Sequence, residues 1–176
     1  MKKFLTFALC FATIGAANAQ MGSVPTPPEF KKVAFFAGPW HGSVVMQGMG
    51  MPPTKANGTM NGKVILDGKY IQSMSMTKMG KAGSMEGTHL ISYDPFKKQF
   101  VAFWFDSSAP GVMEMSGNFQ GSKLVMTSKP TEIPGMPEPA VMRVTWSRPS
   151  TSKLEMLLEM KQGDKWVKLI ESKYSR

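Results

Sequence analysis

The sequence predicts an all-β protein: an up-and-down antiparallel β-barrel of about ten strands, with a short N-terminal helix plugging one end. From Trp40 onward, apolar and polar residues alternate with a period of two, as in strands that bury one face. Gly, Pro, Asn and Asp recur about every eight to twelve residues, the spacing of short strands joined by turns. Most of these links are tight turns, such as Asp67-Gly68 and Gly163-Asp164, which favours pairing between strands that follow each other in the chain.

The residues before the first strand predict a helix of about three turns. Thr26 stands three residues before Glu29, with Pro27 and Pro28 between them, which is the pattern of a capping box with Thr26 as N-cap. An apolar stripe follows at helical spacing, and Gly38 would end the helix. The stripe consists of Phe30, Val33, Ala34 and Ala37.

The alternating segments predict ten strands. These lie near residues 40–47, 59–66, 70–79, 85–93, 99–105, 113–119, 123–127, 141–147, 153–160 and 165–174. Two longer connections, 48–58 and 130–139, contain prolines, which lack the amide proton that a central strand needs. Neither connection is expected to form a central strand.

The first nineteen residues predict a secretory signal peptide. Lys2 and Lys3 precede an uncharged, mostly apolar run that is too short to span a bilayer, and Ala17-Asn18-Ala19 is a small-x-small cleavage site. We therefore expect cleavage after Ala19, a flexible segment over 20–27 and a single barrel domain over 28–176. The mature protein is expected in the periplasm or outside the cell, with no membrane-spanning segment. Cys10 is the only cysteine in the sequence, and cleavage after Ala19 would remove it, so no disulfide is expected in the mature protein.

Charge and motifs exclude several functional classes. The formal net charge is +9, but the basic residues stand singly or in pairs such as Lys97-Lys98, with no run or motif typical of a nucleic-acid partner. Nucleophile, zinc and phosphate-binding motifs are missing from the sequence. We therefore expect a protein that is not an enzyme and carries no cofactor.

The most unusual feature of the composition is its 17 methionines. Because residues two apart point the same way along a strand, the apolar phase of most strands carries Met. The predicted lumen-facing, ligand-binding set is Val44, Met46, Met74, Met76, His89, Ile91, Met113, Met115, Met142, Trp146 and Met156. Thioether side chains adapt to varied apolar guests, which favours a binding protein for a small hydrophobic or amphipathic molecule. The alternative is a Met-filled core without a ligand, in a structural or interaction protein.

A second hypothesis uses the same side chains for metal. Thioether sulfur is a soft ligand that suits Cu(I). Three Met-x-Met pairs could supply it, formed by Met49, Met51, Met74, Met76, Met113 and Met115. A periplasmic copper-binding protein is therefore the alternative function.

Several motifs resemble a known family. Ala37-Gly38-Pro39-Trp40-His41-Gly42 is similar to the G-x-W start of calycin barrels, the superfamily of lipocalins and fatty-acid-binding proteins. With Ile65–Tyr70, Ser92–Asp94, Phe103–Ser107 and the closing Lys173–Arg176, residues 29–176 resemble the bacterial family called domain of unknown function 1579.

The resemblance implies structural roles for Gly38, Trp40 and Arg176. Trp40 would close the barrel floor, covered by Arg176 or Lys173 through a cation–π contact. Some related ten-stranded barrels hold haem through a His on a late strand, but the strands from Val141 onward contain no His, so haem is not expected.

Overall fold

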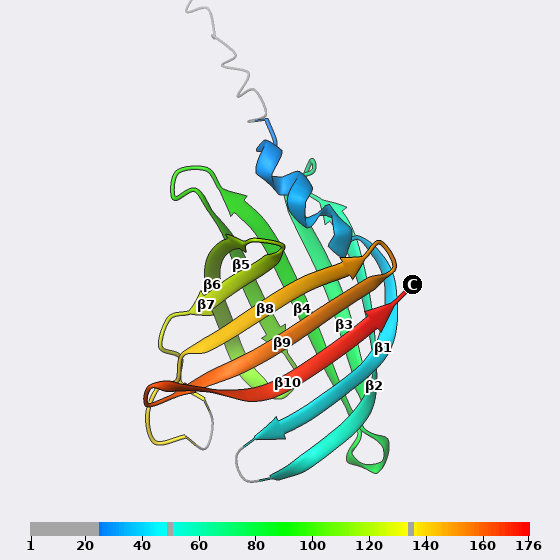
Figure 1. Ribbon diagram of the computed structural model, residues 1–176, viewed down its shortest axis with the longest axis vertical. Coiled ribbons are helices and arrows are strands. Elements are labelled where there is room, and N and C mark those ends of the chain that lie inside the picture. Colours follow the sequence, from blue (N-terminus) through cyan, green and yellow to red (C-terminus); the bar gives the residue numbers. More distant parts are fainter. Residues whose placement is uncertain (1–24, 49–50, 134–135) are drawn as a thin grey trace, which may run out of the picture.

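The computed structural model describes residues 25–48, 51–133 and 136–176. The predicted signal peptide lies outside these residues. The described chain forms one closed antiparallel barrel in which each strand pairs with the next and β10 pairs with β1 (Figure 1). The predicted fold class is therefore confirmed.

The ten strands follow one 3₁₀-helix, and a second short 3₁₀-helix lies between β3 and β4. In chain order the elements are η1 Pro28–Phe36, β1 Gly38–Gly48, β2 Met51–Ile65, β3 Tyr70–Lys78, η2 Gly80–Ala82, β4 Ser84–Asp94, β5 Gln99–Asp106, β6 Ala109–Gln120, β7 Lys123–Ser128, β8 Met142–Ser150, β9 Lys153–Gln162 and β10 Lys165–Ser175.

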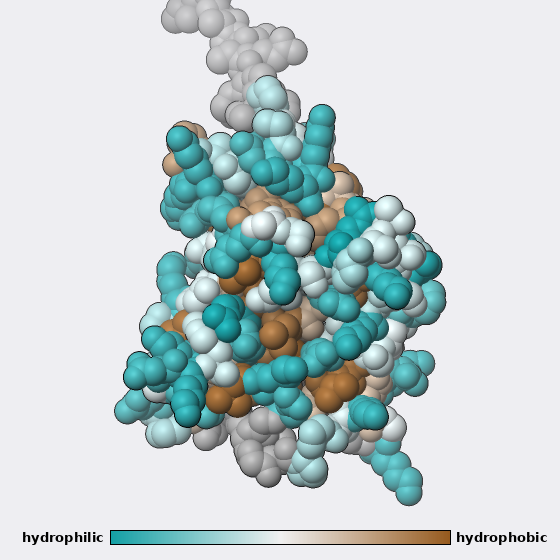
Figure 2. Space-filling view, in the orientation of Figure 1, coloured by the Kyte–Doolittle hydropathy of each residue, from teal (hydrophilic) through white to brown (hydrophobic). Residues whose placement is uncertain are grey.

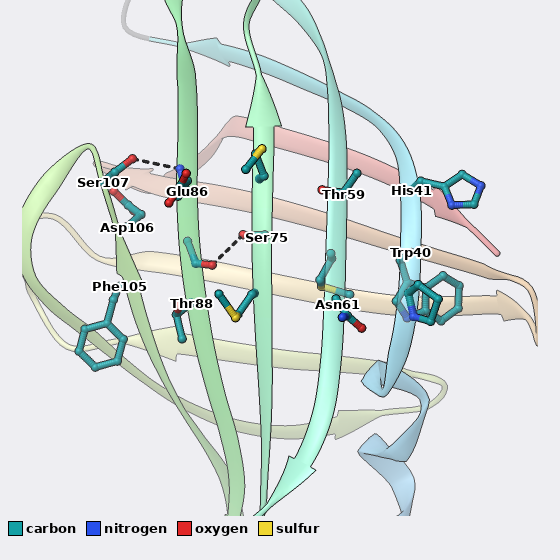
Figure 3. Close-up of a pocket in the computed structure, with 15 residues that line it drawn as sticks. Trp40, His41, Thr59, Asn61, Ser75, Glu86, Thr88, Phe105, Asp106 and Ser107 are labelled. Carbon is teal, nitrogen blue, oxygen red and sulfur yellow. Dashed lines mark hydrogen bonds between the residues drawn. The ribbon is translucent and has the colours of Figure 1, made fainter.

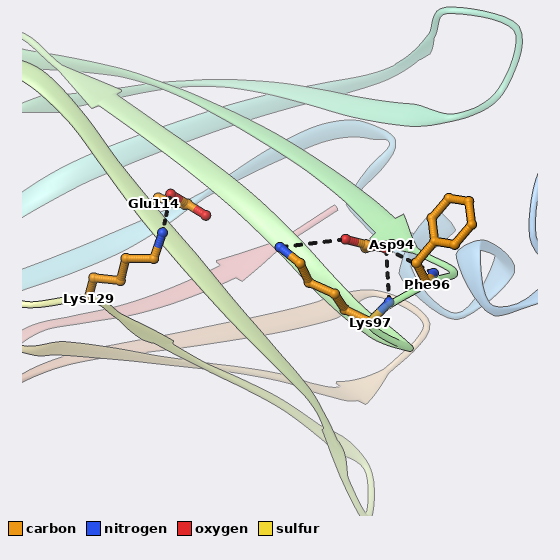
Figure 4. A network of polar contacts seen from close by, with 5 residues as sticks. All are labelled: Asp94, Phe96, Lys97, Glu114 and Lys129. Carbon is orange, nitrogen blue, oxygen red and sulfur yellow. Dashed lines mark hydrogen bonds and ion pairs between the residues drawn. The ribbon is translucent and has the colours of Figure 1, made fainter.

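Asp94 shows how a side chain stabilises one of the tight turns. Its Oδ1 accepts hydrogen bonds from the backbone N–H groups of Phe96 (2.9 Å) and Lys97 (3.0 Å), which orders the turn between β4 and β5 (Figure 4). On the outer face of β6, Glu114 pairs with Lys129 at 3.0 Å. Both interactions leave the charged groups outside the barrel, as the alternation requires.

The N-terminal helix differs from the prediction in period and in cap. The segment forms a 3₁₀-helix whose buried residues, Phe30, Val33 and Phe36, are three apart, because a 3₁₀-helix has three residues per turn. Ala34, which an α-helix would have turned inward, is exposed. Pro27 takes the N-cap position, and the Thr26 hydroxyl donates instead to the carbonyl of Asp67 at 3.3 Å.

The prediction of a long connection over 48–58 is wrong. β2 begins at Met51, so β1 and β2 form a hairpin that pairs from Gly48 with Met51 onward. The prolines at 52 and 53 are accommodated because the register shifts between Met46 and Gly48, and a bulge tolerates residues without an amide proton. The connection between β7 and β8 contains one isolated bridge, between Thr131 and Ala140.

The helix closes one end of the barrel (Figure 1). Phe36 is fully buried and meets Trp146 edge to face at a centroid distance of 4.9 Å. Trp40 is also buried, and the Arg176 guanidinium carbon lies 4.2 Å from its ring centroid. Arg176 Nη1 donates to the Ala37 carbonyl at 2.9 Å, so the last residue joins the helix to the barrel floor. Arg176, rather than Lys173, covers Trp40.

Candidate binding site in the barrel lumen

The barrel opens at the end opposite η1. A cavity of about 360 Å³ lies there, between the β5–β6 turn, the β7–β8 connection and the strands below them. Its wall is mainly apolar, and its rim at Pro110, Val112 and Glu132 is exposed to solvent. The main apolar lining residues are Met85, Trp104, Met113, Met142, Leu158 and Ile170. The volume and the apolar wall are those of a small-molecule pocket.

A second, much smaller cavity lies deeper in the lumen. Its volume is about 20 Å³, room for about one water molecule. Met85, Trp104 and Ile170 line both cavities, so the small cavity continues inward from the mouth. Val44, Met60, Ser75, Thr77, His89, Trp146, Met156, Ser172 and Tyr174 complete its wall.

Two side chains at this junction carry buried polar atoms without a hydrogen-bond partner among the described residues. These atoms are His89 Nε2 and Trp104 Nε1. Both residues are less than one tenth exposed, and their rings pack against each other with centroids 4.0 Å apart and planes tilted by 38°. Buried polar atoms are nearly always paired in native proteins, so this pair marks a place where a ligand or a water molecule completes the structure.

The floor of the lumen is electrically neutral at pH 7. Burial lowers the pKa of His89 to about 4, and the nearby Asp106 charge opposes this only in part, so the imidazole is uncharged. Burial likewise raises the pKa of the Tyr174 hydroxyl, which stays protonated. Charge appears only towards the mouth, where Asp106 and Glu132 contribute carboxylates to the lining of the larger cavity.

Strand register places these residues side by side. Ser73 of β3 lies opposite His89 of β4, His89 lies opposite Trp104 of β5, and Trp104 lies opposite Met113 of β6. Ser73 also pairs with Gly62 of β2. One row across the barrel wall therefore runs from small side chains on β2 and β3 to large ones on β4, β5 and β6. At Gly62 the absence of a side chain admits the backbone of η1, because a Cβ atom there would lie 2.1 Å from the Phe36 carbonyl oxygen.

Most of the predicted lumen residues do lie inside the barrel. Val44, His89, Ile91, Met115, Met142, Trp146 and Met156 are buried, and Met46 and Met113 are half-buried. Two of them, Met113 and Met142, line the mouth cavity, while Ile91 and Met115 pack in the core. The role of these residues in binding a ligand stays a prediction.

The inward placement of Met74 and Met76 is wrong. Met74 is 59% exposed, and both side chains line a groove on the outer surface. The buried residues of β3 are Ile71, Ser73 and Thr77 instead. Hydrophobicity alone therefore assigns the wrong face of β3.

This correction separates two of the three Met-x-Met pairs that the copper hypothesis uses. Met74 and Met76 lie outside the barrel, whereas Met115 is buried inside it, so the two Met-x-Met pairs cannot share a metal ion. Met51 begins β2, and Met49 lies outside the described residues. Among the described residues there is no cluster of three or more His, Cys, Asp or Glu side chains that could hold a metal ion.

Trp104 is the main site residue that the sequence prediction missed. β5 is apolar on both faces, so alternation alone could not orient it. The tight turn after Asp94 provides the missing signal, because pairing Asp94 with Gln99 fixes the register and sets Trp104 opposite His89. Two further buried methionines, Met60 and Met126, were also missed.

A wider groove of about 660 Å³ lies on the outer face of β1 to β5 (Figure 3). Ser107 Oγ accepts a hydrogen bond from the Glu86 N–H at 3.0 Å, and Ser75 Oγ donates to the Gly87 carbonyl at 3.3 Å. The hydrogen-bonding side chains of Thr59 and Asn61 are exposed and therefore hydrated.

The outer face over β8, β9 and β10 is mixed in character. Figure 2 shows small hydrophobic areas there, separated by hydrophilic side chains. Salt bridges contribute to the hydrophilic part, between Arg143 and Glu159 at 2.7 Å and between Lys168 and Glu171 at 2.8 Å. In this view the face presents no continuous apolar patch. None of the helices in the described part of the chain has the length and hydropathy to cross a membrane.

Comparison with known proteins identifies the family. A family model described as "Protein of unknown function (DUF1579)" matches residues 27–176, nearly the whole barrel and its helix. The chain belongs to the DUF1579 family. No curated protein matches the sequence.

Two solved structures share the fold of this DUF1579 protein. The crystal structure of Rv2717c from M. tuberculosis is 11% identical, with a TM-score of 0.63, over 86% of this chain and 99% of that one. The S-type phycobiliprotein lyase CPES from Guillardia theta is also 11% identical, with a TM-score of 0.55, over 84% of this chain and 90% of that one. At this identity the likeness shows a shared fold and nothing about chemistry.

Proposed function

We propose that this protein binds a small hydrophobic or amphipathic molecule in the barrel lumen and does not transform it. One observation carries the proposal: Trp104, whose buried N–H is unpaired, lines an apolar cavity of about 360 Å³ at the mouth and also the small inner cavity that His89 lines. A cavity of this kind gives a ligand apolar contact along its length and hydrogen-bonding groups at its inner end.

The methionine side chains in the cavity walls support binding of apolar molecules of different shapes. Met113 and Met142 line the mouth, and Met156 lines the inner cavity. Unbranched thioether side chains repack around irregular apolar shapes at little cost. One similar structure is described as a lyase, but that activity belongs to that protein. Here the innermost His89 is uncharged and packed against Trp104, which suits recognition better than proton transfer at neutral pH.

Native mass spectrometry of the protein purified from its own compartment tests the proposal. We expect an organic adduct that dissociates at higher collision energy. Met113→Trp should remove the adduct by filling the cavity, whereas Met74→Trp, the same substitution on the outer face, should retain it. A bare mass for the wild-type protein, or an adduct that persists in the Met113→Trp variant, would overturn the proposal.

We further propose that the protein is exported and works in the periplasm or outside the cell. The basic, apolar and small-residue segments of the first nineteen residues support this. The intact mass of the protein from its native host should correspond to a chain that begins at Gln20. Recovery of a chain that still carries residues 1–19 would contradict export by cleavage.

A further inference from the structure

The charges around the lumen discriminate between classes of ligand, an inference that rests on the binding function proposed above. Of the described residues that line the two cavities, none is a Lys or Arg. A carboxylate drawn into the lumen would lose its hydration without meeting a cation, and a buried charge without a partner is strongly disfavoured. At the mouth it would also pass the carboxylates of Asp106 and Glu132.

The polar atoms at the inner end need an uncharged partner. An indole N–H only donates, so Trp104 Nε1 requires an acceptor. His89 is neutral, so its Nε2 either donates or accepts a hydrogen bond according to its tautomer. A hydroxyl oxygen meets both requirements, since it accepts from the indole and can either accept from or donate to the imidazole.

Gly87 keeps the approach to the indole nitrogen open. It lies on the same face of β4 as His89, two residues away, and has no side chain to cover Trp104. A Cβ atom built at Gly87 would lie 3.7 Å from Trp104 Nε1 and 2.9 Å from Ser75 Oγ. A methyl group there would be in van der Waals contact with the indole nitrogen and would narrow the space beside it.

We propose that the lumen takes a small apolar molecule that enters head first and carries an uncharged oxygen head group, of the hydroxyl or carbonyl kind, which accepts the hydrogen bond of Trp104. The apolar tail then lies against Met113, Met142 and Leu158 at the mouth. A fatty acid carboxylate is excluded from this site.

Calorimetric titration of the full mature protein with 1-octanol and with octanoate at pH 7 tests the proposal. The two probes share a chain length and differ in the charge of the head group. We expect 1-octanol to bind and octanoate to bind more than about a hundredfold more weakly, because its charge has no partner in the lumen. Equal or tighter binding of octanoate would overturn the inference about the head group and leave the binding function standing. If neither probe binds and native mass spectrometry also shows a bare protein, both proposals fail.

Two variants test the hydrogen bond itself. Trp104→Phe removes the N–H and keeps an aromatic ring, and it should weaken 1-octanol binding by about tenfold, as expected for one buried hydrogen bond. Gly87→Ala keeps Trp104 and narrows the space beside its nitrogen, and it should have a similar effect. Trp166→Phe makes the same change in a ring that packs against Arg143 and lines neither cavity, so it is the control and should change the affinity less than about twofold. Unchanged affinity in both Trp104→Phe and Gly87→Ala would refute the assigned contact.

Discussion

Burial of His89 should make the barrel sensitive to acid. In the folded protein its side chain is 7% exposed, and burial lowers its pKa from 6.5 to about 4, with the Asp106 charge opposing the shift in part. The unfolded chain binds a proton at His89 below about pH 6.5, whereas the folded chain does so only below about pH 4. The stability that comes from the neutral, buried ring is therefore present above pH 6.5 and is lost as the pH falls towards 4.

The size of this effect follows from the two pKa values. Each pKa unit corresponds to about 1.4 kcal/mol of difference between the protonation states. Proton binding at His89 of the unfolded chain therefore lowers the free energy of unfolding by about 2 kcal/mol between pH 7 and pH 5. The loss reaches about 3 kcal/mol by pH 4. Because folded domains are stable by only about 5–15 kcal/mol, this single residue would account for a substantial part of acid denaturation.

Urea denaturation at a series of pH values from 7 to 4.5 measures the effect. Wild-type protein is compared with His89→Gln, which removes the titrating group, and with His41→Gln, which removes the exposed histidine. The carboxylates titrate in all three proteins, so the difference between the curves isolates His89. We expect the wild-type and His41→Gln curves to fall together and the His89→Gln curve to fall by about 2 kcal/mol less between pH 7 and 5. Three parallel curves would refute the assignment of a neutral, buried His89.

Further substitutions test other parts of the structure. Arg176→Ala should lower the unfolding free energy by about 1 kcal/mol in urea denaturation, through the lost cation–π contact and hydrogen bond; the same change at Arg148, whose guanidinium lies 5.9 Å from the nearest ring centroid, should have under half that effect. Gly117→Ala should destabilise by about 4 kcal/mol or more, because its Cβ would lie 2.0 Å from a backbone oxygen, and a normal melting temperature would contradict this packing. Met113→Ser should weaken 1-octanol binding about fivefold by removing apolar contact, whereas Met74→Ser should leave it within about twofold; the reverse order would place the ligand on the outer face.

The sequence predicted the fold well because its signals are local. Period-two alternation and turn residues such as Asp67-Gly68 act within a few positions, and they suffice to define ten strands and their sequential pairing. β2 was predicted too short because two prolines near its start lie at a register shift, and that shift depends on pairing with β1. The helix was predicted with the wrong period because nothing local in its short apolar stripe distinguishes three residues per turn from 3.6.

The site was predicted only in part because it depends on volume across several strands. His89 was assigned inward correctly, since it shares a phase with Ile91. The face of β3 was reversed because hydrophobicity favours Met74 over Ser73, whereas Ser73, which lies opposite His89 in the register, is the buried residue. A register argument from the turns would have placed Trp104 beside His89. The lowered pKa of His89 and the unpaired nitrogen atoms of both rings depend on burial, so they become visible only in the assembled barrel.

The methyl groups of the methionines offer the most direct test of where a ligand binds. With ¹³C-labelled methionine methyls, addition of 1-octanol should shift the resonances of Met113 and Met142 at the lumen mouth and produce contacts between these methyls and the octanol chain. The resonance of Met74, on the outer face, should stay in place. Shifts and contacts confined to Met74 and Met76, with Met113 and Met142 unmoved, would contradict the central claim that the barrel lumen is the binding site.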